Sequence, residues 1–61
     1  MIKLTRVNET ALLVNESFIE TVEETPDTVL TMQNGHRYFI KESADEILRK
    51  IMEFEKEKNI R

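Results

Sequence analysis

The chain lacks cysteine and tryptophan, and it contains a single glycine, a single proline and a single histidine. Without cysteine it can form neither a disulfide nor a thiolate metal site, and this is typical of proteins in a reducing compartment. One histidine cannot form a zinc site unless several carboxylates converge on it. The composition therefore predicts no metal site and no cofactor.

Long apolar runs are also missing. No segment approaches the roughly 18 consecutive apolar residues of a transmembrane helix, and the first six residues alternate, unlike the apolar part of a signal peptide. We therefore expect a cytoplasmic protein that does not insert into the membrane. Nine basic against 12 acidic residues give a net charge of −3, which argues against general nucleic-acid binding because that needs a cationic surface.

The length of 61 residues allows one domain, predicted to span residues 1–61. So short a chain buries only about 60% of the surface that its unfolded form exposes. Domains of this size usually gain stability from disulfides, a metal or a partner chain. Because the first two are excluded, we expect a homo-oligomer.

Five segments have the patterns of β-strands. Apolar and polar residues alternate over 2–7, 19–25 and 36–41, the segment 28–32 is rich in β-branched residues, and 10–14 is apolar on both faces. Residues typical of turns separate the segments: Asn8-Glu9, Asn15-Glu16-Ser17, Pro26-Asp27 and Asn34-Gly35. Asn15 is predicted to begin a short helical turn, and Asn34-Gly35 a hairpin with a type I′ turn.

A helix is predicted from Ala44 to about Lys58. It begins at a capping box, in which the Ser43 and Glu46 side chains bond each other's backbone N–H groups. Apolar residues then recur at three- and four-residue spacing, which predicts one stripe against the sheet formed by Ile47, Leu48, Ile51 and Phe54, with Met52 at its margin. Strands followed by one helix predict an α+β fold: a small antiparallel sheet or SH3-like partial barrel of about five strands with one C-terminal helix.

His36 is the one candidate general base. No serine or carboxylate is placed near it by local spacing, so we interpret it as a solvated turn residue and predict no catalytic site and no enzyme. Acidic residues surround Pro26 without metal-ligand spacing: Glu20, Glu23, Glu24 and Asp27. They are predicted to form a solvated edge that discourages strand pairing, the alternative being a site that docks a basic partner.

Arg37, Phe39 and Lys41 share one face of a predicted strand. An exposed aromatic residue between two cations is typical of a single-stranded nucleic-acid platform. Since the chain is acidic, we favour burial of Phe39 under a partner subunit. Leu13 lies on the face of segment 10–14 that one helix cannot cover, and the four residues together are the predicted interface of the homo-oligomer. The alternative is a closed barrel that buries this second face in a monomer.

Several segments of the chain resemble the FlbD family of small flagellar proteins. The family's elements "MI-x-LTRLNG", "N-x-x-x-IE", "E-x-TPDTVI-x-L-x-NG" and "V-K-E-S" are similar to residues 1–8, 15–20, 23–35 and 41–43. The chain departs from the pattern at Glu9, where the family usually has glycine, so the first turn is expected to differ in type.

This resemblance implies a non-enzymatic accessory protein of bacterial flagellar and swarming motility. Because SwrD-like members of the family raise motor power, it implies protein–protein contacts with flagellar motor or stator proteins and a place at the periphery of the motor. Leu4-Thr5-Arg6 and the chain length also resemble the CsrA family of RNA-binding regulators, and the Phe39 strand is similar to strands of LytTR-type DNA-binding modules. The chain lacks the later basic motif of CsrA, so a nucleic-acid partner is the less favoured alternative.

Overall fold

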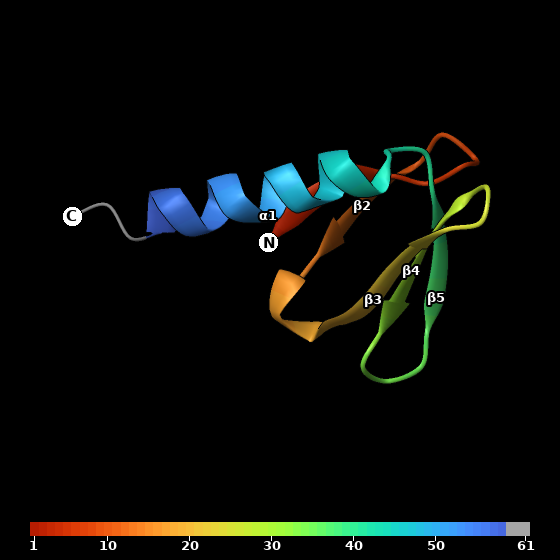
Figure 1. Cartoon of the computed structure of the whole chain (residues 1–61), viewed down its shortest axis with the longest axis horizontal. Helices are drawn as coiled ribbons and strands as arrows, with labels where there is room; N and C mark the ends of the chain where they lie inside the picture. Colours follow the sequence, from red (N-terminus) through yellow and green to blue (C-terminus); the bar gives the residue numbers. More distant parts are fainter. Residues whose placement is uncertain (59–61) are drawn as a thin grey trace.

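The computed structural model describes residues 1–58 and contains five strands, one short 3-10 helix and one C-terminal α-helix (Figure 1). The elements are β1 (Ile2–Thr5), β2 (Ala11–Val14), η1 (Glu16–Phe18), β3 (Ile19–Glu24), β4 (Thr28–Met32), β5 (Arg37–Ile40) and α1 (Ala44–Lys58). The predicted α+β fold is confirmed. The strands predicted at 2–7 and 36–41 are shorter than expected, since β1 ends at Thr5 and β5 ends at Ile40.

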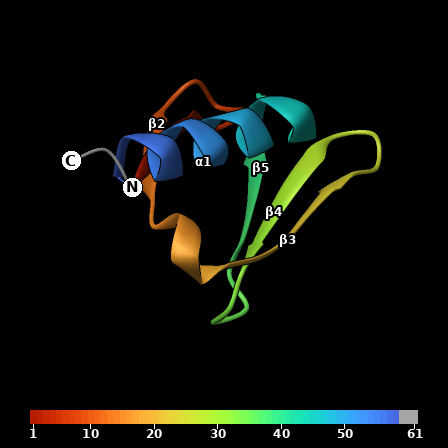
Figure 2. The same ribbon diagram turned by 60° about the vertical axis from the view of Figure 1, so that its left-hand side comes forward.

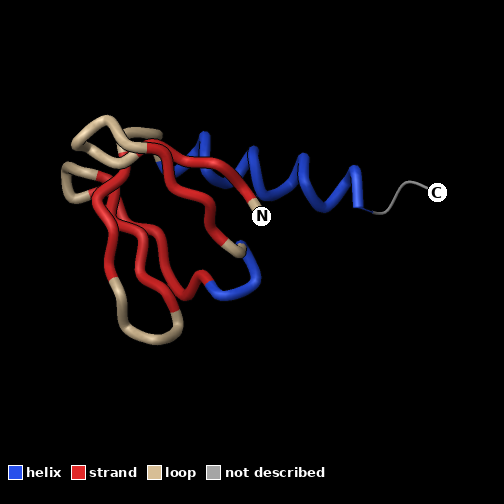
Figure 3. The backbone as a smooth tube through the Cα atoms, turned by 180° about the vertical axis from the view of Figure 1, so that it is seen from behind, coloured by secondary structure: helices blue, strands red, loops and turns tan. Residues whose placement is uncertain are grey.

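The strands form two antiparallel sheets, β1-β2 and β3-β4-β5. A bridge between Arg6 and Ile40 joins the two sheets, with hydrogen bonds from Val7 N–H to the Phe39 carbonyl (3.1 Å) and from Lys41 N–H to the Thr5 carbonyl (2.8 Å). The resulting order β2-β1-β5-β4-β3 curls into a partial barrel whose two end strands are β2 and β3 (Figure 3). Helix α1 packs on β1 and β3 across one end of this barrel (Figure 2).

The core consists of alternating residues from the strands together with one side of α1. Its buried members are Ile2, Leu4, Val14, Leu30, Ile40 and Ile47. On the helix, Ile51 and Phe54 pack against this cluster as predicted. Leu48 is 55% exposed, so the prediction that it belongs to the core is wrong. Successive helical residues are turned by about 100°, which carries Leu48 past the contact with the sheet.

A β-bulge interrupts β3 between Ile19 and Thr21. The simple alternation predicted for this strand would place Ile19 and Val22 on opposite faces. Both residues instead pack against the core. The bulge adds one residue to β3 and thereby shifts the alternation, which brings the two apolar side chains to the same face.

The hairpins at Asn8-Glu9 and Asn34-Gly35 have the same form. Each is a turn closed by a 2.9 Å hydrogen bond, from Glu9 N–H to the Arg6 carbonyl and from Gly35 N–H to the Met32 carbonyl. The residue after each asparagine has a positive φ, +76° for Glu9 and +93° for Gly35. Because Asn34 itself lacks a positive φ, the predicted type I′ turn is not formed. The observed geometry is that of a type I turn followed by a left-handed residue.

The predicted caps and the third turn lie at their expected positions. Ser43 Oγ accepts from Glu46 N–H at 3.1 Å, and the Glu46 carboxylate accepts from Ser43 N–H at 3.1 Å, which is the capping box of α1. Asn15 Oδ1 accepts from Ser17 N–H at 3.0 Å and begins η1. Residues 25–27 join β3 to β4, and the Thr25–Pro26 peptide bond is cis.

Candidate functional site

Three of the predicted interface residues lie near one another on the outer face of β5 or just after it. Arg37 and Phe39 point away from the core, and Phe39 is 54% exposed although it pairs with Val29 in the neighbouring strand β4. Lys41 follows the end of β5 and forms an exposed ion pair with Glu9. Phe39 is therefore an apolar side chain that the chain itself leaves uncovered.

Leu13 lies elsewhere. Leu13 pairs with Lys3 in β1, whereas the Phe39 carbonyl accepts from Val7 N–H. Val7 lies four residues after Lys3, which is roughly 13 Å at the rise of a strand. Leu13 is 63% exposed while Val14 is buried, so residues 1–58 of one chain cover only one face of segment 10–14. Leu13 and Phe39 thus belong to two separate surfaces.

Val7 extends the Phe39 surface and was not among the predicted residues. It is 53% exposed and its N–H donates to the Phe39 carbonyl, so the two apolar residues are neighbours. The sequence did carry a signal, since the alternation of 2–7 places Val7 on the outward face with Lys3 and Thr5. An apolar residue on an otherwise polar strand face is a candidate contact.

Parts of three of the four segments that carry the family resemblance meet beside this surface. The turn after β1, the turn before β4 and the segment after β5 border a hollow of about 320 Å³, lined by Val7, Glu24, Pro26, Asp27, Thr28, Ile40, Lys41 and Ser43. We call this region the motif end. Its parts are held together by the Arg6–Ile40 bridge and by the Glu24 carboxylate, which accepts from Ala44 N–H at 3.1 Å.

Glu42, two residues after β5, links the segment after β5 to the end of β1 through its side chain. Its carboxylate accepts from Thr5 N–H at 2.9 Å and from the Thr5 hydroxyl at 3.0 Å. Partial burial raises the pKa of Glu42, but the hydrogen bonds from Thr5 and from its own backbone N–H, with the nearby charge of Lys50, outweigh it and leave the pKa lowered. The charged carboxylate is therefore the form that the folded chain stabilises.

A second hollow, of about 390 Å³, lies at the opposite end of β4 and β5. Its lining is Phe18, Met32, Gln33, Asn34 and Tyr38. The guanidinium of Arg6 lies 5.4 Å from the centre of the Tyr38 ring, and the exposed His36 ring meets Tyr38 edge-on at 6.4 Å. No carboxylate or hydroxyl of the described residues forms a hydrogen bond with His36, so the geometry assembles no acid–base pair there.

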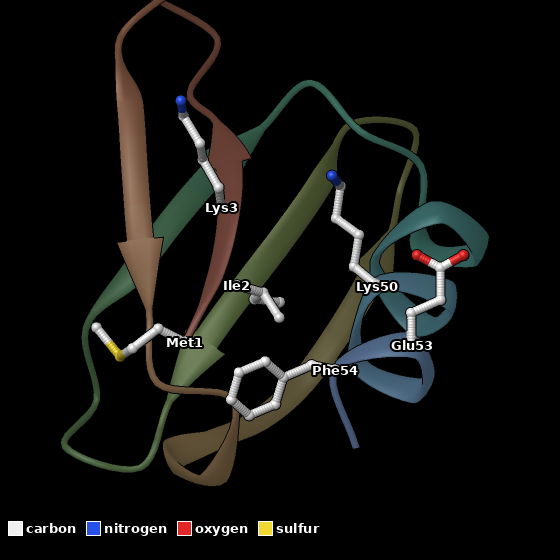
Figure 4. A pocket seen from close by; sticks show the side chains of 6 residues that line it. All are labelled: Met1, Ile2, Lys3, Lys50, Glu53 and Phe54. Atoms are coloured by element: carbon white, nitrogen blue, oxygen red, sulfur yellow. The ribbon is translucent and has the colours of Figure 1, made fainter. Parts of the chain in front are cut away.

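A third hollow marks the contact of α1 with β1. The Phe54 ring lies beside Ile2, while Lys3, Lys50 and Glu53 stand at its rim (Figure 4). Within residues 1–58, the side chains of 57 and 58 left aside, the structure groups no three histidine or carboxylate side chains that could hold a metal ion. Over the same range it shows no helix of the length and apolarity that crossing a membrane requires.

The fold and these surfaces define a small α+β domain with a curled antiparallel sheet. The family model for FlbD, flagellar and swarming motility proteins, matches residues 1–58. The chain therefore belongs to the FlbD family and has a role in flagellar or swarming motility. No curated protein and no solved structure matches the chain significantly. None of the comparisons supports the CsrA-like alternative.

Proposed function

We propose that this chain is a non-enzymatic accessory protein of the bacterial flagellum that supports motor power or stator function. It acts from the cytoplasm, at the periphery of the motor, by binding a motor or stator protein. The observation that supports this is the gathering of three family-like segments, 4–8, 25–28 and 41–43, around one hollow at the motif end. Segments so distant in sequence meet there beside exposed apolar residues, as expected of a binding surface.

The chemistry of the surface favours one kind of partner. Phe39 and Val7 provide exposed apolar area, and an aromatic anchor of this kind is common at the centre of protein interfaces. Around them stand Glu9, Glu24 and Asp27. The cations on this side are Lys41, which Glu9 already pairs, and Arg37 further along β5, away from the motif end. We therefore expect the partner to present an apolar pocket for Phe39 with basic residues at its rim.

The experiment is complementation of a strain from which the gene has been deleted. Phe39→Lys should reduce the torque of single motors and the rate of swarming, with filament number unchanged. Leu48→Lys is the matched control, because Leu48 is equally exposed (55% against 54%) but lies on α1. It should restore wild-type torque, and the abundance of each variant is measured in the same cells.

Wild-type torque in the Phe39→Lys strain at normal abundance would contradict the proposed surface. Loss of filaments in the deletion strain would mean that the protein acts in assembly and not in motor power. Tight, sequence-specific RNA capture by the purified protein at a stated salt concentration would contradict a protein-binding role.

A further inference from the structure

Strand β2 is an end strand of the sheet, and its outer edge is unpaired within residues 1–58. In Figure 4, β2 is the brown arrow that lies beside β1, on the side of β1 away from α1. The Arg6 N–H donates to the Thr10 carbonyl at 2.9 Å, so Arg6 and Thr10 form a hydrogen-bonded pair at the end of the ladder between β1 and β2. Bonded and non-bonded pairs alternate along an antiparallel ladder, so Leu12 and Val14 bond β1.

Ala11 and Leu13 consequently direct their backbone groups away from β1. Among the described residues, neither backbone nor side chains of other elements form hydrogen bonds with these two N–H and two C=O groups. Their side chains are exposed as well, Leu13 to 63%. The edge thus offers both the backbone pattern and the apolar side chain that a further strand would use.

The two end strands of the sheet differ in how they are protected. Strand β3 carries Glu20, Glu23 and Glu24 and is interrupted by a bulge, two features that discourage pairing with another chain. Strand β2 has the sequence Ala-Leu-Leu-Val, without a charge, a proline or a bulge. In a chain of net charge −3, this uncharged edge is where two copies can approach without repulsion.

We propose that β2 pairs antiparallel with β2 of a second copy, across a two-fold axis that passes between the two Leu12 residues. In this register Ala11 of each copy forms a hydrogen-bonded pair with Leu13 of the other, which satisfies every outward backbone group of both residues. The large Leu13 side chain meets the small Ala11 side chain on the outer face. Once the two β2 strands are paired, neither has free outward backbone groups for a third chain, so the assembly stops at a dimer.

A second copy is the occupant that these features favour. The strand is complementary to itself in the register above, and every chain carries the same edge at the same concentration. The contact of two such short strands is smaller than the 1,200–2,000 Å² of a typical stable interface, so we expect a dissociation constant of about 1 μM or weaker. The inference concerns assembly alone and does not depend on the motility role.

The test is sedimentation equilibrium of the full chain from about 10 μM to about 1 mM, where a dimer of this affinity is detected. The expected mass at the upper end is twice the 7.2 kDa of one chain. Leu13→Lys puts a charge on the edge and should remain a folded monomer, because the side chain it replaces is exposed. Phe39→Lys, the matched control on the other surface, should dimerise as the wild type does.

Amide hydrogen exchange provides a measurement that needs no variant. Slow exchange of Ala11 and Leu13 at high concentration, and fast exchange on dilution, is expected if β2 pairs with β2. A monomer throughout the series would overturn the proposal. So would dimerisation that survives Leu13→Lys, dissociation caused by Phe39→Lys, or growth beyond two chains.

Discussion

The left-handed conformation of Glu9 leads to a prediction about stability. Glu9 has a φ of +76° and Gly35 has a φ of +93°, at the same position of two hairpins of the same form. Glycine adopts this region freely, whereas a residue with a β-carbon brings that atom close to a neighbouring carbonyl oxygen. We predict that Glu9→Gly stabilises the protein.

The expected gain follows from three contributions. Left-handed backbone at a non-glycine residue costs about 1–2 kcal/mol, which the substitution relieves. Glycine costs about 0.5–1 kcal/mol more conformational entropy on folding. Loss of the exposed Glu9–Lys41 ion pair costs less than about 1 kcal/mol, and much less at high salt. The net gain at high salt is about 0.5–1 kcal/mol, or about 2–8 °C in Tm for a domain of this size.

Urea denaturation followed by circular dichroism measures the gain, since the chain has no tryptophan to report by fluorescence. All variants are compared at one protein concentration. Glu9→Gln keeps the left-handed β-carbon and removes the charge, so it isolates the ion pair and should change the free energy of unfolding little. Gly35→Glu is the reciprocal change, and nothing lies within 4 Å of the added β-carbon. It should destabilise the protein by about 1 kcal/mol through the backbone alone.

A neutral or destabilising Glu9→Gly, combined with a neutral Glu9→Gln, would refute the reasoning. The same holds if Gly35→Glu leaves the free energy of unfolding unchanged, because the two positions have the same backbone conformation.

Three further predictions concern the core and Glu42. Glu42→Gln should cost about 1 kcal/mol at neutral pH. Because the folded pKa of Glu42 is lowered, its contribution is present above the ordinary glutamate pKa and is lost as the pH falls through the folded value, so urea denaturation should show the variant and wild type converging in acid. Ile47→Ala should lower the free energy of unfolding by about 2–5 kcal/mol, because Ile47 is buried. The neighbouring change Leu48→Ala should lower it by less than about 0.5 kcal/mol, and urea denaturation at constant pH measures both. Ile51→Asp should unfold the domain, and an unchanged melting temperature would contradict the packing of α1.

The features that could be predicted from the sequence are those set by neighbouring residues. The capping box at Ser43 and Glu46 depends on groups three residues apart, and the alternation of Ile2 and Leu4 already identifies their buried face. The hairpin at Asn34-Gly35 was likewise located. Its turn type was not, because the same dipeptide suits both a type I′ turn and a type I turn with a left-handed residue after it. Resemblance of short motifs was enough to identify the family.

Only the tertiary structure decided which of these elements meet. The link between Thr5 and Glu42 spans 37 positions, and no local pattern specifies it. The same long-range joining of β1 to β5 brings Val7 beside Phe39 and gathers the motif end, and within residues 1–58 the edge of β2 with Leu13 stays unpaired. Local patterns state which side of an element is apolar. Whether another part of the chain covers that side depends on how the elements are placed in space, and this separated Leu13 from Phe39.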